Sequence, residues 1–398
     1  RGADSMKKIA AFFTALIMAG ITILGMHVYS SGKTEFHSPD FGFWTAEQKF
    51  QAPEAVKSNL NENSLVIMAS SELEHGKGTP YHPQNMFKGN VFQPMLLGAR
   101  PLSEPVPCDH AGRDRAGDGE PESSAARISQ WFRPRGILPK AYASRFSESA
   151  FIDMLKNKNL SEETKREITD RTINLLSADR TMQNRIISYK KLLIEHEKNP
   201  IETAKFKAYN AFLNEKQRQS VLIQSAVDGI RRDQETGLEI KEPDWEASYA
   251  NAEKDARKMT SNNRFQISNK YYNWKVKPQL KKRKGSSVSS SYLESPEYKD
   301  LKCFLDVCED LEIEPMIVLL PVNGKWYDYT KFPKDGLAAY YSKVSDTVKE
   351  YQDAKLVDLS AISDQDYYLE DTIHIGWKGW VKLDEIIYQF GGKDQGTS

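Results

Sequence analysis

The sequence predicts an α/β fold in which helices cover a parallel β-sheet. Three short runs of residues, 65–69, 315–320 and 356–359, are almost wholly apolar, which is typical of strands buried on both faces. The second and third runs each follow a segment with helical spacing, at 298–311 and 336–351. Helices and strands that alternate along a chain build a parallel sheet, because each crossover between parallel strands needs a long connection.

A long helical segment interrupts the predicted α/β domain. Residues 146–260 are rich in Glu, Lys, Gln and Leu, contain few Gly or Pro, and repeat their apolar residues at helical spacing. We therefore expect 64–145 to form the first part of the α/β domain, 146–260 a helical insertion or lid, and 261–391 the second part. Within the insertion, the pattern predicts long helices at 159–176, 180–198 and 201–230.

The N-terminal segment predicts a membrane anchor. Residues 9–29 are largely apolar and include no Asp, Glu, Lys or Arg, and about 20 such residues span a bilayer as a helix. Lys7 and Lys8 precede them, which favours a cytoplasmic N-terminus and an exported, extracellular remainder. A cleaved signal peptide is the alternative, but the apolar stretch is long for one and lacks a following small-residue cleavage site. We expect the polar residues 30–63 to form a stalk.

One segment differs in composition from its surroundings. Residues 100–127 are crowded with Pro, Gly, Asp and Arg, and Leu102 and Val106 are the only large aliphatic residues among them. This composition favours disorder over a buried strand. The segment's abrupt edges also suit translation in a shifted reading frame, with a native loop as the alternative. Either way, we expect the sheet to lack a core strand here.

Charge and residue spacing exclude several classes of function. The chain has 55 basic and 55 acidic residues, so its net charge gives no reason to expect a nucleic-acid partner. His75 and His82 do not have the spacing of known zinc motifs, and we predict no metal site.

Residues 281–287 are basic and then serine-rich, which predicts a solvated loop. Contact with a phosphate polymer or with lipid headgroups is the alternative for this loop.

Two separate positions suggest acyl-transfer chemistry. Ser71 stands two residues after the end of the first apolar run, and active residues in open parallel sheets lie at the carboxyl ends of strands. Asp371 and His374 stand three apart near the C-terminus, followed by a glycine- and tryptophan-rich stretch at 375–380 that suits a pinned loop. A serine becomes a nucleophile when a histidine takes its proton and a carboxylate orients that histidine. Each signal alone also fits an ordinary turn, so the hypothesis depends on their combination.

Five segments of the chain together resemble a known family. They are SSEL at 70–73, FQPMLLGA at 92–99, SQWF at 129–132, PVNGKWY at 321–327 and DTIHIGWKGW at 371–380. A serine after an early strand and an Asp-x-x-His near the chain end is the order of the SGNH/GDSL hydrolases. The five segments resemble the DltD family in particular, the D-alanyl transfer proteins of teichoic acid D-alanylation in Gram-positive bacteria. The resemblance extends from about residue 6 to 391.

The resemblance implies a fold and a set of site residues. The fold would be the three-layer, flavodoxin-like α/β fold of the SGNH hydrolases, with one membrane anchor and the catalytic domain outside the cell. Ser71 would be the nucleophile, His374 the base and Asp371 the orienting acid. Gly98 and Asn323 are candidates for the oxyanion or substrate site, although the Asn-Gly pair at 323 also predicts a turn. The glycine turn that the family has after residue 99 is replaced here by 100–127.

The resemblance also implies partners. D-Alanine would arrive from a small carrier protein with a phosphopantetheine arm and a membrane-bound O-acyltransferase, and no bound cofactor is expected. The acceptor would be a glycerol hydroxyl of lipoteichoic acid. Two alternatives stay open: an esterase or thioesterase that releases D-alanine from mischarged carrier, and a non-catalytic scaffold that docks the carrier protein or the O-acyltransferase at the membrane.

Overall fold

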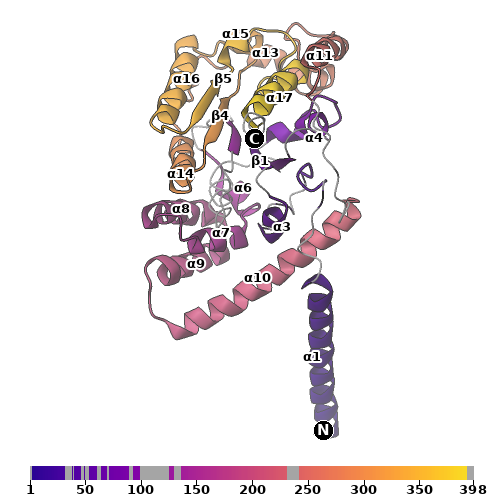
Figure 1. The fold of residues 1–398 in the computed structure, drawn as a ribbon, viewed down its shortest axis with the longest axis vertical. Helices are drawn as coiled ribbons and strands as arrows, with labels where there is room; N and C mark the ends of the chain where they lie inside the picture. Colours follow the sequence, from indigo (N-terminus) through magenta and orange to yellow (C-terminus); the bar gives the residue numbers. More distant parts are fainter. Residues whose placement is uncertain are drawn as a thin grey trace, which may run out of the picture.

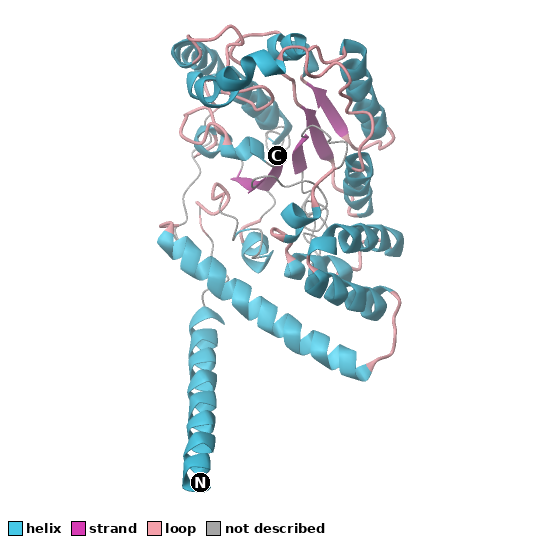
Figure 2. Ribbon diagram, turned by 180° about the vertical axis from the view of Figure 1, so that it is seen from behind, coloured by secondary structure: helices cyan, strands magenta, loops and turns pink. Residues whose placement is uncertain are grey.

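The computed structural model describes most of the chain. The described residues are 2–31, 38, 40–45, 49, 53–60, 64–69, 71–88, 93–98, 125–129, 136–230 and 242–391. A central sheet lies between two groups of helices, and one long helix, α1 (Gly2–Ser31), projects from the rest of the molecule (Figures 1 and 2).

Five strands of the described residues form one sheet. They are β1 (Ser64–Ala69), β2 (Gln93–Gly98), β3 (Ala125–Ser129), β4 (Pro315–Leu319) and β5 (Lys355–Asp358). Their order across the sheet is β2-β1-β3-β4-β5, and every neighbouring pair is parallel. This is the strand order of flavodoxin-like, doubly wound folds. The predicted α/β class, with its parallel sheet, is confirmed.

Successive side chains of the central strands enter two different cores. In β1, Leu65 and Ile67 pack into one core, and Val66 and Met68 pack into the other. Side chains of β4 alternate between the same two cores. Successive residues of a strand point to opposite faces, so a strand covered on both faces needs apolar residues throughout. This explains why both strands appear in the sequence as unbroken apolar runs.

The first core lies on one face of the sheet, and besides α3 (Pro53–Ser58) seven helices of the described residues contribute side chains to it. They are α6 (Pro139–Ala143), α7 (Glu148–Lys156), α8 (Glu162–Leu175), α9 (Arg180–Tyr189), α10 (Pro200–Val227), α14 (Glu297–Asp310) and α16 (Lys334–Lys349). Two short turns of helix, η2 (Leu176–Ala178) and η3 (Lys190–Ile194), follow α8 and α9. The helices predicted at 159–176, 180–198 and 201–230 correspond to α8, to α9 with η3, and to α10.

The second core lies on the opposite face. Its elements include η1 (Ser71–Glu74), α11 (Trp245–Met259) and α17 (Trp377–Gly391), with α4 (Pro83–Met86) beside them. The remaining short elements are α12 (Asn269–Tyr271), η4 (Tyr272–Val276), η5 (Lys277–Gln279), α13 (Leu280–Arg283), α15 (Gly324–Thr330) and η6 (Ser360–Ile362).

Most of the helical insertion lies away from the carboxyl ends of the strands. Helices α7–α10 gather at the end of the sheet that faces α1, whereas α11, α13 and α15 lie at the other end (Figure 1). Helix α10 contacts α1 directly, because Glu215 accepts a hydrogen bond from Ser30 Oγ (2.9 Å) and lies 2.7 Å from Nδ1 of His27. Helices α7–α10 therefore lie towards α1, and the interpretation of 146–260 as a helical insertion or lid stays a prediction.

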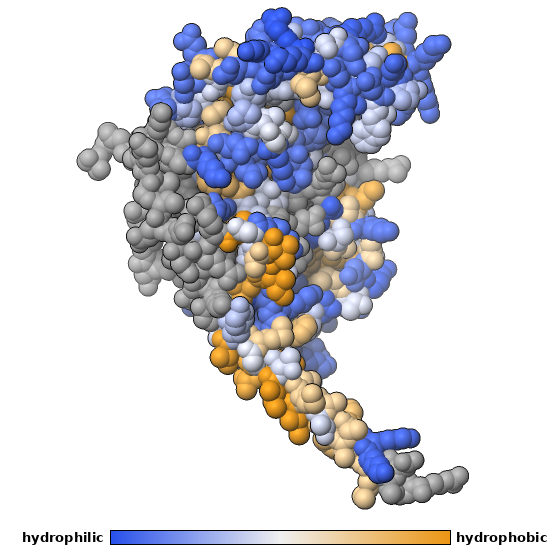
Figure 3. Space-filling model, turned by 90° about the vertical axis from the view of Figure 1, so that its right-hand side faces the viewer, coloured by the Kyte–Doolittle hydropathy of each residue, from blue (hydrophilic) through white to orange (hydrophobic). Residues whose placement is uncertain are grey.

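Helix α1 is long and apolar enough to cross a membrane. The candidate span is Met6–Ser31, which includes the predicted 9–29, and nearly all of it is exposed in the structure. Figure 3 shows apolar residues along this projecting helix and hydrophilic residues over much of the opposite end of the molecule. The prediction of one N-terminal apolar helix of membrane-spanning length is confirmed, and its orientation across the membrane stays a prediction.

Residues between α1 and β1 pack against the core, which corrects the interpretation of 30–63 as a stalk. Among the described residues, Phe41 and Trp44 are buried, and α3 (Pro53–Ser58) adds Ala55 and Val56 to the first core. The Lys49 side chain is also buried, and its Nζ donates hydrogen bonds to three backbone carbonyl oxygens, one of them in β2. The polar composition concealed these few anchoring side chains.

Strand β3 corrects the expectation that a core strand is missing. It pairs with β1 and β4 and so occupies the centre of the sheet. Its first three residues, 125–127, belong to the segment judged unable to form a strand, but they contain neither Gly nor Pro. The average composition of 100–127 concealed them. Residues 99–124 and 130–135 lie outside the described residues, so the shifted-frame interpretation stays a prediction.

Candidate functional site

Ser71 lies at the carboxyl end of the sheet. It is the first residue of η1 and comes two residues after the end of β1. The chain passes from β1 to β2 on one side and later to β3 on the other, so β1 and β3 flank the point where the strand order reverses. Open α/β sheets bind their ligands outside the carboxyl ends of strands at this point. The topology therefore places Ser71 where a ligand site is expected.

Asp371 and His374 lie in a tight loop between β5 and α17. A β-bridge between Leu369 and Ile375 closes the base of the loop. Inside it, the Glu370 N–H donates a hydrogen bond to the His374 carbonyl oxygen at 2.9 Å. These backbone contacts fix the turn that carries both functional side chains.

The glycines that follow His374 let α17 approach this loop. A Cβ atom at Gly379 would overlap the carbonyl oxygen of Tyr368, and one at Gly376 would lie 2.6 Å from the amide nitrogen of Glu370. Glycine is the residue that permits such close backbone contact. The glycine-rich stretch thus holds the loop against the first turn of the helix.

The three predicted residues form one chain of hydrogen bonds. Ser71 Oγ lies 2.8 Å from His374 Nε2, and His374 Nδ1 lies 2.8 Å from Asp371 Oδ2. The carboxylate accepts a hydrogen bond from the Nδ1–H group, so the neutral ring presents the Nε2 lone pair to the serine hydroxyl. Such an arrangement can move a proton from Ser71 to His374 as the oxygen attacks an acyl group.

Asp371 is buried but fully paired. Burial alone would raise the pKa of this carboxyl group, but the hydrogen bond and the charge of His374 oppose it. The backbone N–H groups of Ile373 (2.9 Å) and His374 (2.8 Å) also donate to Asp371 Oδ1. Together these contacts place the pKa of Asp371 below its ordinary value, so the group is ionised at neutral pH.

The pKa of His374 is shifted in the opposite direction. Burial lowers it, but the hydrogen bond and negative charge of Asp371 outweigh burial and raise the pKa above its ordinary value. The nearby charges of Glu72 and Glu370 act in the same direction. The site therefore stabilises the imidazolium that forms when His374 accepts a proton.

His75 is a neighbour of the site that the sequence analysis considered only as a metal ligand. Its ring stacks on His374, with centroids 3.9 Å apart and planes 12° from parallel. Glu370 Oε2 lies 3.3 Å from His75 Nδ1, and Trp380 Nε1 donates to the His75 carbonyl oxygen at 3.1 Å. The stack restricts rotation of the His374 ring. The only signal in the sequence is the position of His75, four residues after Ser71.

His82, the other histidine considered as a ligand, is structural. It is buried, Nε2 donates to the Leu73 carbonyl oxygen at 3.2 Å, and Nδ1 accepts from the Gln84 N–H at 3.1 Å. Burial is the main cause that lowers the pKa of His82 to about 4. A neutral ring in this position caps α4.

The site has the residue types of a metal centre but a poor geometry for one. The ligand-type atoms of His75, Asp371 and His374 all lie within 4.8 Å of one another. However, both oxygens of Asp371 already accept hydrogen bonds from the loop. The two rings are nearly parallel, so their in-plane lone pairs run side by side instead of converging on one ion. The absence of a metal site stays a prediction.

Asn323 and Gly98, the candidate oxyanion or substrate residues, have clear structural contacts. Asn323 caps α15 through its Oδ1, which accepts from the Trp326 N–H at 2.9 Å, and its Nδ2 donates to Phe265. Its backbone N–H donates to the Thr372 carbonyl oxygen at 3.1 Å, which links it to the Asp371–His374 loop. Gly98 ends β2, where a Cβ atom would lie 2.6 Å from the Leu73 side chain. Their part in catalysis stays a prediction.

Comparisons with known proteins support one family. The model of a family described as "DltD protein" matches residues 125–391. "Protein DltD" of Bacillus subtilis (strain 168) is 31% identical over 335 residues, covering 82% of each chain. "Protein DltD" of Staphylococcus aureus (strain NCTC 8325 / PS 47) is 30% identical over 329 residues, covering 81% of this chain and 79% of its own. The chain therefore belongs to the DltD family.

Proposed function

We propose that this protein transfers D-alanyl groups to lipoteichoic acid through an acyl-enzyme on Ser71. Membership of the DltD family supports the broader part of this proposal, involvement in the D-alanylation of teichoic acid. The hydrogen-bonded chain from Ser71 through His374 to Asp371, at the carboxyl edge of the sheet, supports the finer part. This chain is the single observation on which the mechanism rests.

The mechanism has two acyl-transfer steps. Ser71 Oγ attacks the carbonyl carbon of a D-alanyl thioester or ester, and His374 Nε2 accepts the serine proton. The tetrahedral intermediate collapses, and His374 returns the proton to the departing thiol or alcohol. A glycerol hydroxyl of the polymer then attacks the Ser71 ester while His374 accepts its proton. The second collapse restores the serine hydroxyl and leaves D-alanine on the polymer.

Asp371 stabilises the imidazolium in both steps without itself taking the proton. Its lowered pKa keeps it ionised while His374 carries the positive charge. A tetrahedral oxyanion also needs hydrogen-bond donors aimed at it. The Ser71 backbone N–H, Gly98 and Asn323 are our candidates.

The proposed setting is the outer face of the cell membrane. Helix α1 would be the single-pass anchor, with its N-terminus in the cytoplasm and the α/β domain outside. D-Alanine would come from the phosphopantetheine arm of a carrier protein by way of a membrane-bound O-acyltransferase. The protein itself would need no bound cofactor.

A serine-directed probe tests this proposal. The full-length protein in detergent should be labelled at Ser71 by a fluorophosphonate, and Ser71→Ala should abolish the labelling. In cells, Ser71→Ala should reduce lipoteichoic acid D-alanylation to that of a deletion strain, whereas Ser144→Ala, at the exposed end of α6, should retain it. Full D-alanylation by Ser71→Ala would contradict every enzymatic role and leave the scaffold hypothesis.

Product analysis separates transfer from hydrolysis. The same acyl-enzyme can react with water or with a polymer hydroxyl, because His374 can accept a proton from either one. Purified protein, a D-alanyl thioester and lipoteichoic acid should yield ester-linked D-alanine on the polymer. Free D-alanine as the only product would instead support the esterase or thioesterase alternative.

A further inference from the structure

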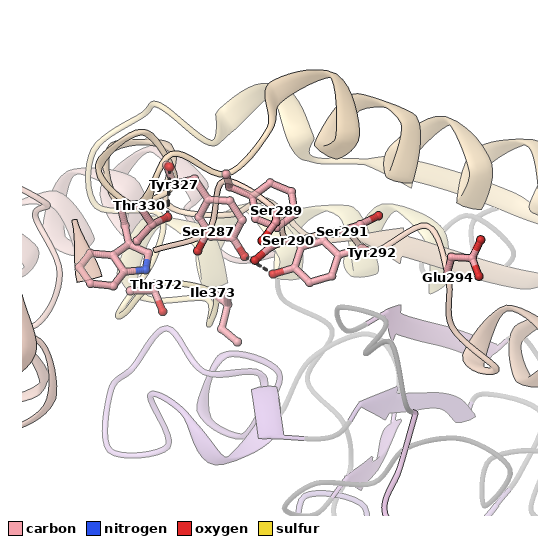
Figure 4. A pocket seen from close by; sticks show the side chains of 12 residues that line it. Ser287, Ser289, Ser290, Ser291, Tyr292, Glu294, Tyr327, Thr330, Thr372 and Ile373 are labelled. Carbon is pink, nitrogen blue, oxygen red and sulfur yellow. Dashed lines mark hydrogen bonds between the residues drawn. The ribbon is translucent and has the colours of Figure 1, made fainter. Parts of the chain in front are cut away.

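A cavity of about 540 Å³ lies beside the Asp371–His374 loop. Four serines among residues 287–291 line it together with aromatic side chains that include Tyr292 and Trp326. Thr372 and Ile373 form part of its wall, so the cavity touches the two residues between the proposed acid and base (Figure 4). A cavity with many hydroxyl groups and aromatic walls suits a ligand with several hydroxyl groups and short carbon units.

The walls of this cavity are held in place. The Ser287 N–H donates to the Thr330 carbonyl oxygen at 2.8 Å, which ties the serine segment to the end of α15. Tyr292 and Tyr327 share a hydrogen bond of 2.8 Å between their hydroxyl groups, and Tyr292 stacks on Phe332 with centroids 4.8 Å apart. The cavity is therefore a built feature of the fold.

A second cavity, of about 220 Å³, extends the first. The two share four lining residues, Ser287, Trp326, Thr330 and Thr372. The second cavity adds the cationic side chains of Lys275 and Arg283. We call the two cavities together the serine groove.

The charge of the serine groove is uneven along its length. Residues 272–284 contain six Lys or Arg and no Asp or Glu. Within the described part of the chain, no ion pair involves any of these six cations. Glu294, the one carboxylate among the residues that line the larger cavity, lies at the far end from Thr372 (Figure 4). One end of the groove therefore favours an anionic group and the other favours hydroxyl groups.

We propose that the serine groove binds a polyol-phosphate chain, with a phosphodiester group at Arg283 and Lys275 and a hydroxylated unit between the serines and Thr372. The guanidinium and ammonium groups would donate charge-assisted hydrogen bonds to phosphate oxygens. The serine hydroxyls and the aromatic walls hold the polyol unit next to the proposed site. This proposal rests on the proposed function, since it locates where the acceptor polymer binds.

The position of the groove favours a polymer over the lipid headgroups of the membrane that α1 would cross. Helix α13 lies at the end of the molecule opposite the projecting α1 (Figure 1). A long chain can reach this end, whereas headgroups anchored in that membrane stay at the α1 end. The basic segment 281–287, predicted as a loop, begins in α13 instead, and in this proposal its Arg283 binds the phosphate.

A binding assay with defined probes tests the proposal. The full-length protein in detergent should bind a fluorescent synthetic oligomer of glycerol phosphate. The double variant Lys275→Gln, Arg283→Gln should bind it about tenfold more weakly, because hydrogen bonds to charged groups are the stronger ones. Ser289→Trp, which fills the larger cavity, should also lose binding. Fluorophosphonate labelling of Ser71 should stay unchanged in all these variants.

Matched controls make the result decisive. The double variant Lys198→Gln, Lys207→Gln removes the same charge from exposed positions in and next to α10 and should bind as the unaltered protein does. An equal loss in this control, or equal binding of an uncharged polyglycerol oligomer, would overturn the proposal.

Phosphatidylglycerol vesicles that bind more tightly than the oligomer, and compete with it, would assign the groove to lipid headgroups and also overturn it. Failure of the proposed function appears separately, as absent Ser71 labelling in the unaltered protein.

Discussion

Two buried aspartates near the C-terminus have opposite environments. Asp371, in the loop before α17, is 2% exposed and accepts hydrogen bonds from His374 and from two backbone N–H groups. Asp384, inside α17, is fully buried, and neither of its carboxylate oxygens has a hydrogen-bond partner among the described residues. The pKa of Asp371 is lowered, whereas burial raises the pKa of Asp384 well above its ordinary value.

The comparison shows that burial alone does not decide the charge of a carboxyl group. Both side chains lose water, which disfavours the ionised form. Only at Asp371 do a hydrogen-bonded histidine and preplaced backbone N–H donors compensate for that loss. The loop around Asp371 therefore maintains a negative charge, whereas the helix around Asp384 favours a neutral acid.

The largest expected effect comes from removing the charge of Asp371. Asp371→Asn should lower the rate of D-alanyl thioester turnover by about 10³–10⁴-fold, because the amide favours the wrong tautomer of His374. Steady-state kinetics on the purified full-length protein would measure it. Asp353→Asn, at an exposed turn, is the control and should retain full activity. A loss below about tenfold would remove Asp371 from the mechanism.

The pH profile of the same variant tests the coupling between Asp371 and His374. A base must be neutral to act, so activity should rise with pH through the raised pKa of His374. Without the carboxylate, only the weaker effects of Glu72 and Glu370 oppose burial, and the inflection of the residual activity should move to lower pH. An inflection that does not move would show that another group governs the profile.

Asp384 should have a smaller effect, on stability instead of activity. The raised pKa of Asp384 means that the folded state favours its protonated form. Asp384 therefore does not destabilise the fold through its charge below about pH 4, and this destabilisation grows as the pH rises. The lowered pKa of Asp371 has the opposite effect on stability. Its ionised form stabilises the fold above about pH 4, and this stabilisation is lost as the pH falls through the pKa of Asp371 in the folded state.

Asp384→Asn should accordingly raise the free energy of unfolding at pH 8 by on the order of 1 kcal/mol, because the amide has no ionised form whose burial destabilises the fold. Thermal unfolding at pH 4 and pH 8 would measure this, with Asp353→Asn again as the control. Because the effect depends on the pH, the gain should be smaller at pH 4. A variant that is less stable at pH 8 would show that the Asp384 carboxylate has a partner outside the described residues.

The sequence predicted the parts of the site that are specified by short local patterns. An apolar run before Ser71 identified a strand, and the spacing of Asp371 and His374 identified a loop that contains both. The resemblance to one family then linked positions some 300 residues apart, which no local pattern can do. The central strand β3 was not predicted, because the average composition of 100–127 concealed the three residues that begin it.

The features that the sequence did not predict depend on tertiary packing. The stack of His75 on His374 requires η1 to lie against the loop before α17. The serine groove requires two distant segments, 287–291 and 326–330, to meet beside Thr372. The stalk interpretation failed because a few buried side chains, such as Phe41 and Lys49, anchor an otherwise polar segment. In each case residues that are distant in sequence come into contact, so no local sequence pattern shows that they meet.

The smallest expected effect concerns His75, which contacts the site without belonging to its hydrogen-bonded chain. An aromatic pair contributes about 0.5–1.5 kcal/mol, so His75→Ala should lower kcat by about three- to tenfold and leave KM unchanged. His75→Phe keeps a flat ring against His374 and should retain most of the activity. If His75→Phe is as impaired as His75→Ala, the hydrogen-bonding contact between His75 and Glu370 matters more than the stack. The pair of variants therefore separates ring packing from polar contact beside the His374–Asp371 pair.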